Sequence, residues 1–188
     1  GYLFVVLKDC PNIFVCFFLL LIFAVVGCHM TGNEKQVSVK AKQNGTVMND
    51  STPKVTGIGG IFFKSKNPAA TKEWYSRNLG MALNEYGSVF EFRNAVRPDE
   101  INYLQWSPFE EETRYFDPSE KEFMINYRVQ HIEKLVENLK NDGVTVLDGI
   151  EEFEYGKFVH ILDPEGNKIE LWEPVDSVLT KLGGPTTK

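Results

Sequence analysis

The sequence predicts an α+β fold made of two βαβββ units in tandem. Segments typical of strands and helices follow one another in the same order in residues 55–108 and in residues 122–175. When the two halves are aligned at an offset of about 64 residues, Asn67 falls on His131 and the element order matches. An internal duplication is the simplest explanation of this repeated order.

The first unit begins with a β-rich run, "GIGGIFFKS", shortly after Val55. A helix is predicted next, because Asn67 is a good N-cap, Pro68 suits the first turn and Gly80 is a typical stop. We expect three side chains of this helix to face the sheet: Trp74, Tyr75 and Leu79. Strand-like pieces follow around residues 82–86, 88–93 and 102–106.

The second unit repeats the pattern with a strand, "EFMINYRV", and a helix, "HIEKLVENLKNDG". Apolar residues at i, i+3, i+4 and i+7 predict that one face of this helix packs on the sheet, and Gly143 ends it. Three strands are predicted after it: "VTVLDGI", "GKFVHIL" and "NKIELWE". Residues 109–123 are predicted to be an acidic, solvated connector, and residues 177–188 a tail that packs briefly and then frays.

The first 54 residues differ from the rest in composition. Residues 13–26 are continuously apolar, which is too short for a comfortable span of about 20 residues but fits the core of a signal peptide. The stretch ends in "VVGC", which resembles a bacterial lipoprotein box with Cys28 as the lipidated residue. Residues 1–28 are therefore predicted to be a leader that anchors the protein to the bacterial envelope, followed by a flexible polar linker over residues 29–54. The alternative is a cytoplasmic product that begins near Met30.

Charge and cysteine content exclude several functions. The net charge is −6 and the chain has no basic cluster, so a nucleic-acid partner is not expected. All three cysteines (Cys10, Cys16 and Cys28) lie in the first 28 residues. The rest of the chain therefore has no disulfide, thiol nucleophile or thiolate metal site.

The last predicted hairpin carries a family resemblance. "DPEG", at residues 163–166, suits a type I turn. In its context, "GKFVHILDPEGNKIELWEP" closely resembles the C-terminal signature of the vicinal oxygen chelate superfamily, which includes glyoxalase I, bleomycin and fosfomycin resistance proteins and extradiol dioxygenases. "GIFFKSKNPAATKEWYSRNLGM" resembles the opening of the first module of that superfamily. The resemblance covers residues 55–175 and implies an open, cup-shaped mixed sheet with helices outside. A homodimer is also a possibility, because modules of this family often pair.

The resemblance also implies a metal site that this chain retains only in part. Family enzymes hold a divalent ion (Fe, Mn, Ni, Zn or Co) through His, Gln or Glu side chains on four strands. The fourth position falls on Glu170, but the first falls on Gly60 and the third on Met124. The second falls on Leu104 or Gln105. At most two of the four positions can bind metal, unless His160 replaces a ligand or acts as a base.

Strand alternation extends the candidate site beyond the metal positions. If Glu170 faces the cup, further side chains follow on the same side and make an apolar pocket with a few polar groups. The candidate ligand-binding residues are Phe62, Gln105, Met124, Asn126, Arg128, Tyr155 and Trp172, with Glu170 and His160 as candidate catalytic residues. Plain core packing would explain the apolar members equally well, and Glu170 and His160 could be hydrogen-bonded structural groups. In an apolar cup the pKa of Glu170 is expected to be raised.

Three functions compete at this point. The first is a protein with a small-molecule site in the cup that lacks the four-ligand metal centre. Such a protein has no certain cofactor. The second is a metal-dependent lyase, isomerase or dioxygenase that uses Glu170 as base or ligand. The third is a membrane-tethered, non-catalytic interaction module.

Overall fold

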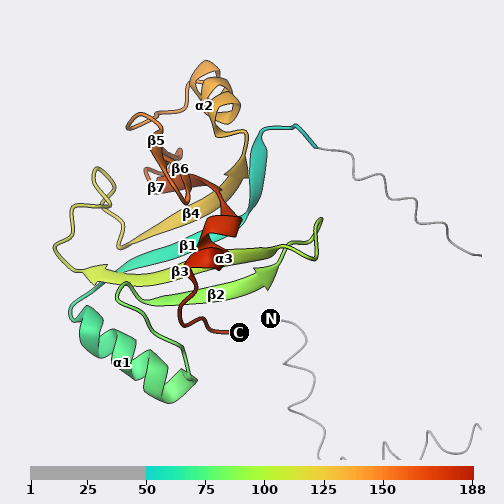
Figure 1. Cartoon of the computed structure of the whole chain (residues 1–188). Helices are drawn as coiled ribbons and strands as arrows, with labels where there is room; N and C mark the ends of the chain where they lie inside the picture. The colour runs from blue at the N-terminus through green and yellow to red at the C-terminus, as the bar shows by residue number, and fades with distance from the viewer. Residues whose placement is uncertain (1–49) are drawn as a thin grey trace, which may run out of the picture. The chain divides into compact units, whose positions relative to one another are not determined.

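The computed structural model describes residues 50–188, which form an open seven-stranded sheet with three helices (Figure 1). The strand order is β2-β3-β1-β4-β7-β6-β5. The elements in chain order are β1 (Lys54–Ser65), α1 (Pro68–Leu79), β2 (Ser88–Arg93), β3 (Ile101–Glu110), β4 (Phe123–Gln130), α2 (Ile132–Asn141), β5 (Glu151–Phe153), β6 (Gly156–Leu162), β7 (Lys168–Pro174) and α3 (Asp176–Leu182). The predicted α+β class with a mixed sheet is confirmed.

Strand pairing reflects the repeated units. β1 and β4, the first strand of each unit, pair antiparallel at the centre of the sheet. Each then pairs in parallel with the last strand of its own unit, β1 with β3 and β4 with β7. The order of the flanking strands is also repeated, since β2 pairs antiparallel with β3 and β6 with β7. The two units therefore contribute matching halves of one sheet.

Two of the predicted strands are reduced to single bridges. Around residues 82–86 only Leu83 pairs, with Ser88, and in "VTVLDGI" only Val146 pairs, with Ile161. The prediction of full strands was wrong there, and a short strand at β5 was missed. Val144, Val146 and Ile150 instead pack their side chains against the core of the second unit. Apolar side chains at alternate positions resemble a strand in sequence, even where the backbone forms almost no ladder.

Helix α2 packs on the sheet as its periodicity predicts. Ile132 and Val136 are buried in a cluster with Val129, Val159 and Leu171. His131 precedes the helix with a positive φ of 57° and its side chain does not cap it. The carboxylate of Glu173 accepts hydrogen bonds from the backbone N–H groups of His131 (2.6 Å) and Ile132 (3.2 Å). A distant strand residue thus satisfies the free N–H groups at this helix start.

Helix α1 has the predicted boundaries but not the predicted packing. Asn67 accepts a hydrogen bond from the N–H of Ala70, and Gly80 ends the helix at φ 70°. Of the three side chains expected on the sheet, only Tyr75 packs there, against the ring of Trp106 at 4.7 Å. Trp74 and Leu79 are 50% and 60% exposed. Trp74 directly precedes Tyr75 on a helix of 3.6 residues per turn, so the two side chains cannot point in the same direction. Leu79 is the last residue of the helix.

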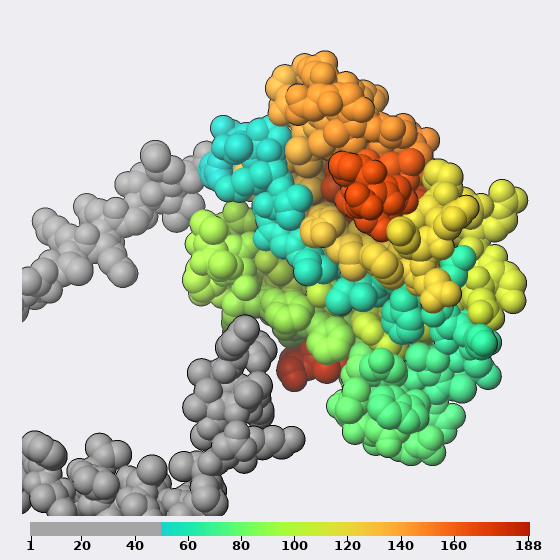
Figure 2. Space-filling model, turned by 180° about the vertical axis from the view of Figure 1, so that it is seen from behind, coloured from blue at the N-terminus to red at the C-terminus, as the bar shows by residue number. Residues whose placement is uncertain are grey.

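Both long helices lie on the outer face of the sheet. Trp106 on β3 and Leu171 on β7 point toward α1 and α2, so their neighbours Gln105 and Glu170 point to the opposite face. Figure 2, seen from behind, shows α1 and α2 as separate masses at opposite ends of this side. α3 differs from them, because it lies on the same face as Gln105 and Glu170, as described below.

The end of the chain is held in place on the edge of the first unit. Thr187 donates its backbone N–H to the carbonyl of Val89 (2.8 Å) and accepts from the N–H of Glu91 (3.3 Å). Its hydroxyl contacts the hydroxyl of Ser88 and the N–H of Ala82, both at 2.9 Å. The prediction that this tail frays was wrong. The segment crosses from the second unit to β2 and pairs there in parallel (Figure 1).

The predicted leader, with Cys28, and most of the predicted linker lie outside the described residues, so membrane anchoring stays a prediction. Within residues 50–188, none of the helices has the length and apolar character needed to cross a membrane.

Candidate ligand-binding site in the cup

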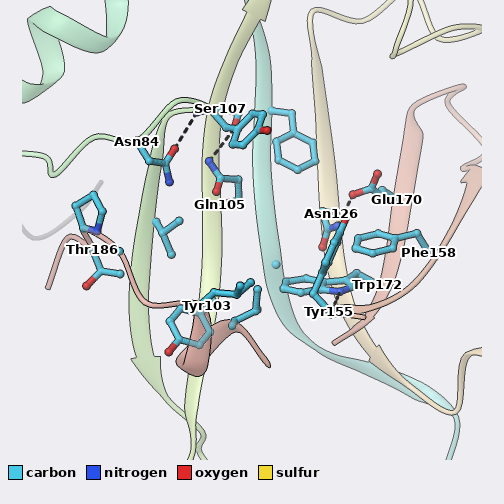
Figure 3. Close-up of a pocket in the computed structure, with 18 of the residues that line it drawn as sticks. Asn84, Tyr103, Gln105, Ser107, Asn126, Tyr155, Phe158, Glu170, Trp172 and Thr186 are labelled. Carbon is cyan, nitrogen blue, oxygen red and sulfur yellow. Dashed lines mark hydrogen bonds between the residues drawn. The ribbon is translucent and has the colours of Figure 1, made fainter. Parts of the chain in front are cut away.

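A cavity of about 690 Å³ lies on the inner face of the sheet (Figure 3). Its floor comes from β1, β3, β4 and β7, and further walls come from the connector between the units and from the C-terminal segment. Of the candidate ligand-binding residues, five line it: Phe62, Gln105, Asn126, Tyr155 and Trp172. Glu170 lines it as well.

The polar centre of the site is one row across five strands. Gln105 is paired with Gly60, Gly60 with Asn126, Asn126 with Glu170, and Glu170 with His160. This register resolves the choice between Leu104 and Gln105 in favour of Gln105. It also shows that Asn126, not Met124, stands beside Glu170 on β4.

Glu170 is 3% exposed, and both of its carboxylate oxygens contact protein donors. Oε1 accepts a hydrogen bond from the hydroxyl of Tyr115. Nε2 of His160 also contacts Oε1, at 3.0 Å. Nδ2 of Asn126 donates to Oε2 at 2.5 Å. Burial alone raises the pKa of Glu170, but the hydrogen bonds from His160, Tyr115 and Asn126 outweigh burial and lower it below the ordinary 4.5. The expectation of a raised pKa was wrong, because the sequence did not reveal these donors.

His160 lies between two carboxylates. Its Nδ1 is 2.6 Å from Oδ2 of Asp148, its backbone N–H donates to Oδ1 of the same residue at 2.8 Å, and its Nε2 faces Glu170. Burial disfavours the charged imidazole, but hydrogen bonds to Glu170 and Asp148 raise the pKa of His160 above 6.5. His160 does not line the cavity, and its hydrogen bond to Glu170 favours the ionised form of that carboxylate.

This arrangement predicts how stability depends on pH. The raised pKa of His160 stabilises the folded state fully below pH 6.5, and this contribution disappears as the pH rises through the raised value. The lowered pKa of Glu170 stabilises above pH 4.5 and is lost as the pH falls through the lowered value. We therefore expect the free energy of unfolding, measured by urea denaturation, to decline as the pH rises above about 6.5. The decline should be smaller in His160→Gln. An equal decline in both proteins would contradict a raised pKa of His160 as its cause.

Two candidate ligand-binding residues do not line the cavity. Met124 is fully buried in a cluster with Phe62 and Phe116. Arg128 is also buried, and its guanidinium contacts Asp176 at 2.5 Å and the carbonyl of Tyr103 at 3.1 Å. Alternation placed both side chains on the correct face, but core packing and an ion pair occupy them.

Three contributors to the site were missed by sequence reasoning. Tyr115 comes from the connector that was expected to be solvated, Asp148 comes from the loop after α2, and residues 179–186 come from the C-terminal segment. The adjacent aromatic residues Tyr115 and Phe116 stand out in an otherwise charged stretch. They could have indicated that the connector packs on the domain, and Phe116 is indeed fully buried. No comparable signal marked Asp148.

The residues present do not fit the four-ligand metal centre of the family. Gly60 has no side chain, and a Cβ there would lie 2.6 Å from the ring of Phe62. Met124 is enclosed by apolar side chains. Among residues 50–188, His, Cys, Asp and Glu side chains form no group of three or more that could hold a metal ion. The oxygens of Glu170 are already bonded to protein donors.

An open mixed sheet with paired βαβββ units and a cavity over its centre defines the class of two-module, cup-shaped domains. The model of the Glyoxalase/Bleomycin resistance protein/Dioxygenase superfamily matches residues 57–171. The chain belongs to this superfamily, and the predicted family is confirmed.

Solved structures with a similar fold include methylmalonyl-CoA epimerase from Mycobacterium tuberculosis, at 21% identity and a TM-score of 0.45, over 67% of this chain and 93% of that chain. A superfamily member from Vibrio splendidus has 14% identity and a TM-score of 0.38, over 65% and 99%. The Mn(II)-bound glyoxalase from Novosphingobium aromaticivorans has 12% identity and a TM-score of 0.47, over 73% and 42%. The comparison with curated proteins finds no match.

Proposed function

We propose that this protein binds a small organic molecule in the cup of its sheet without the help of a metal ion. The observation that carries the proposal is the part of the row from Gln105 to Glu170. At the positions where metal ligands would be needed, this row has a glycine, two amides and a carboxylate tied to protein donors. The cavity above the row is in the size range of small-molecule sites and is lined mainly by aromatic and apolar groups.

The alternative of a metal-dependent lyase, isomerase or dioxygenase that uses Glu170 has less support. A carboxylate with a lowered pKa is a weak base, and the two oxygens of Glu170 already contact the donors Tyr115, His160 and Asn126. These contacts favour a structural and electrostatic role for Glu170 at the wall of a binding site.

Binding in the cavity can be tested with the neutral fluorescent probe Nile red on the full chain. We expect a saturable rise in fluorescence with one site per chain, and no change on adding EDTA. In Val89→Phe the larger side chain projects into the cavity from β2 and should weaken binding at least about fivefold, because overfilling a packed site costs on the order of 1–3 kcal/mol.

The matched control is Val96→Phe, the same substitution at a residue that is 73% exposed and does not line the cavity. Binding that is equal in the two variants would contradict a site in the cup. Binding that EDTA abolishes and Mn, Ni, Zn, Fe or Co restores would show that the site needs metal.

A further inference from the structure

We propose that the cavity takes a positively charged aromatic molecule, such as an arylalkyl amine or an aryl amidine. This inference rests on the proposed function, since it names the class of ligand for the same site. It follows from the charge of the cavity wall, from two acceptor atoms without sufficient donors, and from the aromatic groups beside them.

The wall of the cavity is anionic at one point and has no cation. Among the described residues that line it, Glu170 is the only charged side chain. Two cations that contact the rings of lining residues are occupied elsewhere: Arg128 is paired with Asp176, and Nζ of Lys168 donates to the carbonyl of Tyr115 at 2.7 Å. His160 lies on the neighbouring strand, does not line the cavity, and contacts Glu170 and Asp148. A phosphate or carboxylate in this cavity would therefore lose water and gain no neutralising partner.

Two acceptor atoms near the centre of the row can take further donors. Oε2 of Glu170 accepts only from Asn126 among the described residues, whereas Oε1 accepts from two groups. Oδ1 of Asn126 is buried and has no hydrogen-bond partner within the described part of the chain. The two side chains are bonded to each other, so one ammonium or amidinium group, which carries several N–H donors, can reach both. A buried acceptor without a donor costs free energy, which a ligand of this kind would recover.

Glycine keeps the approach to these acceptors open. A Cβ at Gly59 would lie 2.3 Å from Oδ1 of Asn126 and 2.7 Å from the indole of Trp172. The backbone of β1 can pass this close only without a side chain. Because Gly59 has no side chain, the main chain of β1 does not cover these acceptors.

The surrounding groups favour a planar ligand. Eight of the lining residues are aromatic. Phe158 and Trp172 stack at 5.7 Å with nearly parallel rings, and Figure 3 shows them with Tyr155 on the same side of the cavity as Glu170 and Asn126. Aromatic faces attract cations and stack with flat rings. A ring that carries a positive group matches both parts of this wall.

Three probes with one ring system separate charge from shape: 1-naphthylmethylamine, 1-naphthylmethanol and 1-naphthylacetate. Their affinities for the full chain are to be measured by isothermal titration calorimetry at neutral pH. We expect the amine to bind at least about tenfold more tightly than the alcohol, the ratio typical of a single hydrogen bond to a charged group. The acetate should bind more weakly than the alcohol.

Two variants locate the source of the preference. Glu170→Gln removes the charge and nearly keeps the shape, so the ratio of amine to alcohol affinity should fall to within about threefold, while the exposed control Glu154→Gln should keep it. If Glu170→Gln does not fold, Gln105→Glu gives an independent test. It adds a second carboxylate on the same row, so the preference for the amine should increase.

The outcomes distinguish this inference from the proposed function. An alcohol or acetate that binds as tightly as the amine, while Val89→Phe still weakens Nile red binding, would overturn the charge preference alone. Failure of all three probes together with no effect of Val89→Phe would overturn both.

Discussion

Replacing Asp176 by asparagine is expected to lower the free energy of unfolding by about 3 kcal/mol, because it leaves a buried guanidinium without an anion. The side chain of Arg128 is 7% exposed, and its charge is matched by Asp176 at 2.5 Å. Asp176 also accepts from Nδ2 of Asn102, so it joins the start of α3 to both β4 and β3. The loss should appear in urea denaturation, and cavity binding of Nile red should weaken as α3 loosens.

The matched control is Glu137→Gln, which removes the charge of an exposed ion pair with Lys134 on α2. Exposed pairs of this kind contribute about 0.5 kcal/mol or less. Equal effects of Asp176→Asn and Glu137→Gln would show that the carbonyl of Tyr103 and the ring of Trp172 suffice for Arg128.

Phe116→Ala is expected to cost about 4 kcal/mol of stability, the range found for large aromatic side chains removed from a core. Phe116 is fully buried against Phe62, Met124 and Phe109, although it belongs to the connector between the units. Its removal should leave a cavity and also release Tyr115, which donates to Glu170.

Phe92→Ala is the comparison, because Phe92 is 50% exposed on edge strand β2 and its loss should cost about 1 kcal/mol or less. Thermal or urea unfolding of both variants measures the difference. A small effect of Phe116→Ala would mean that the connector does not contribute to the folded core.

The parts of the fold that the sequence predicts are those encoded locally. The turn between β6 and β7 is an example: Oδ1 of Asp163 accepts from the N–H groups of Glu165 (2.9 Å) and Asn167 (2.8 Å), and Gly166 takes φ 75°. These contacts span four residues, so residue types alone indicate them. The capped start of α1 and the apolar face of α2 are predictable for the same reason.

The site depends instead on contacts that are distant in sequence. Tyr115 and Glu170 are separated by 55 positions, and Thr187 and Ser88 by 99. Family spacing put the third metal-ligand position at Met124, whereas the observed register between β4 and β7 places Asn126 beside Glu170. A shift of two residues keeps a side chain on the same face of a strand, so alternation could not reveal the error.

The C-terminal segment has a consequence for how this protein can diverge. The superfamily model ends at residue 171, but residues 179–186 form part of the cavity wall. The row from Gln105 to Glu170 on the floor thus lies within the domain that the model matches, while part of the enclosure comes from a stretch outside it. Substitutions in that stretch can alter which molecules the cavity admits without touching a strand of the sheet, so the choice of ligand can change while the fold stays constant.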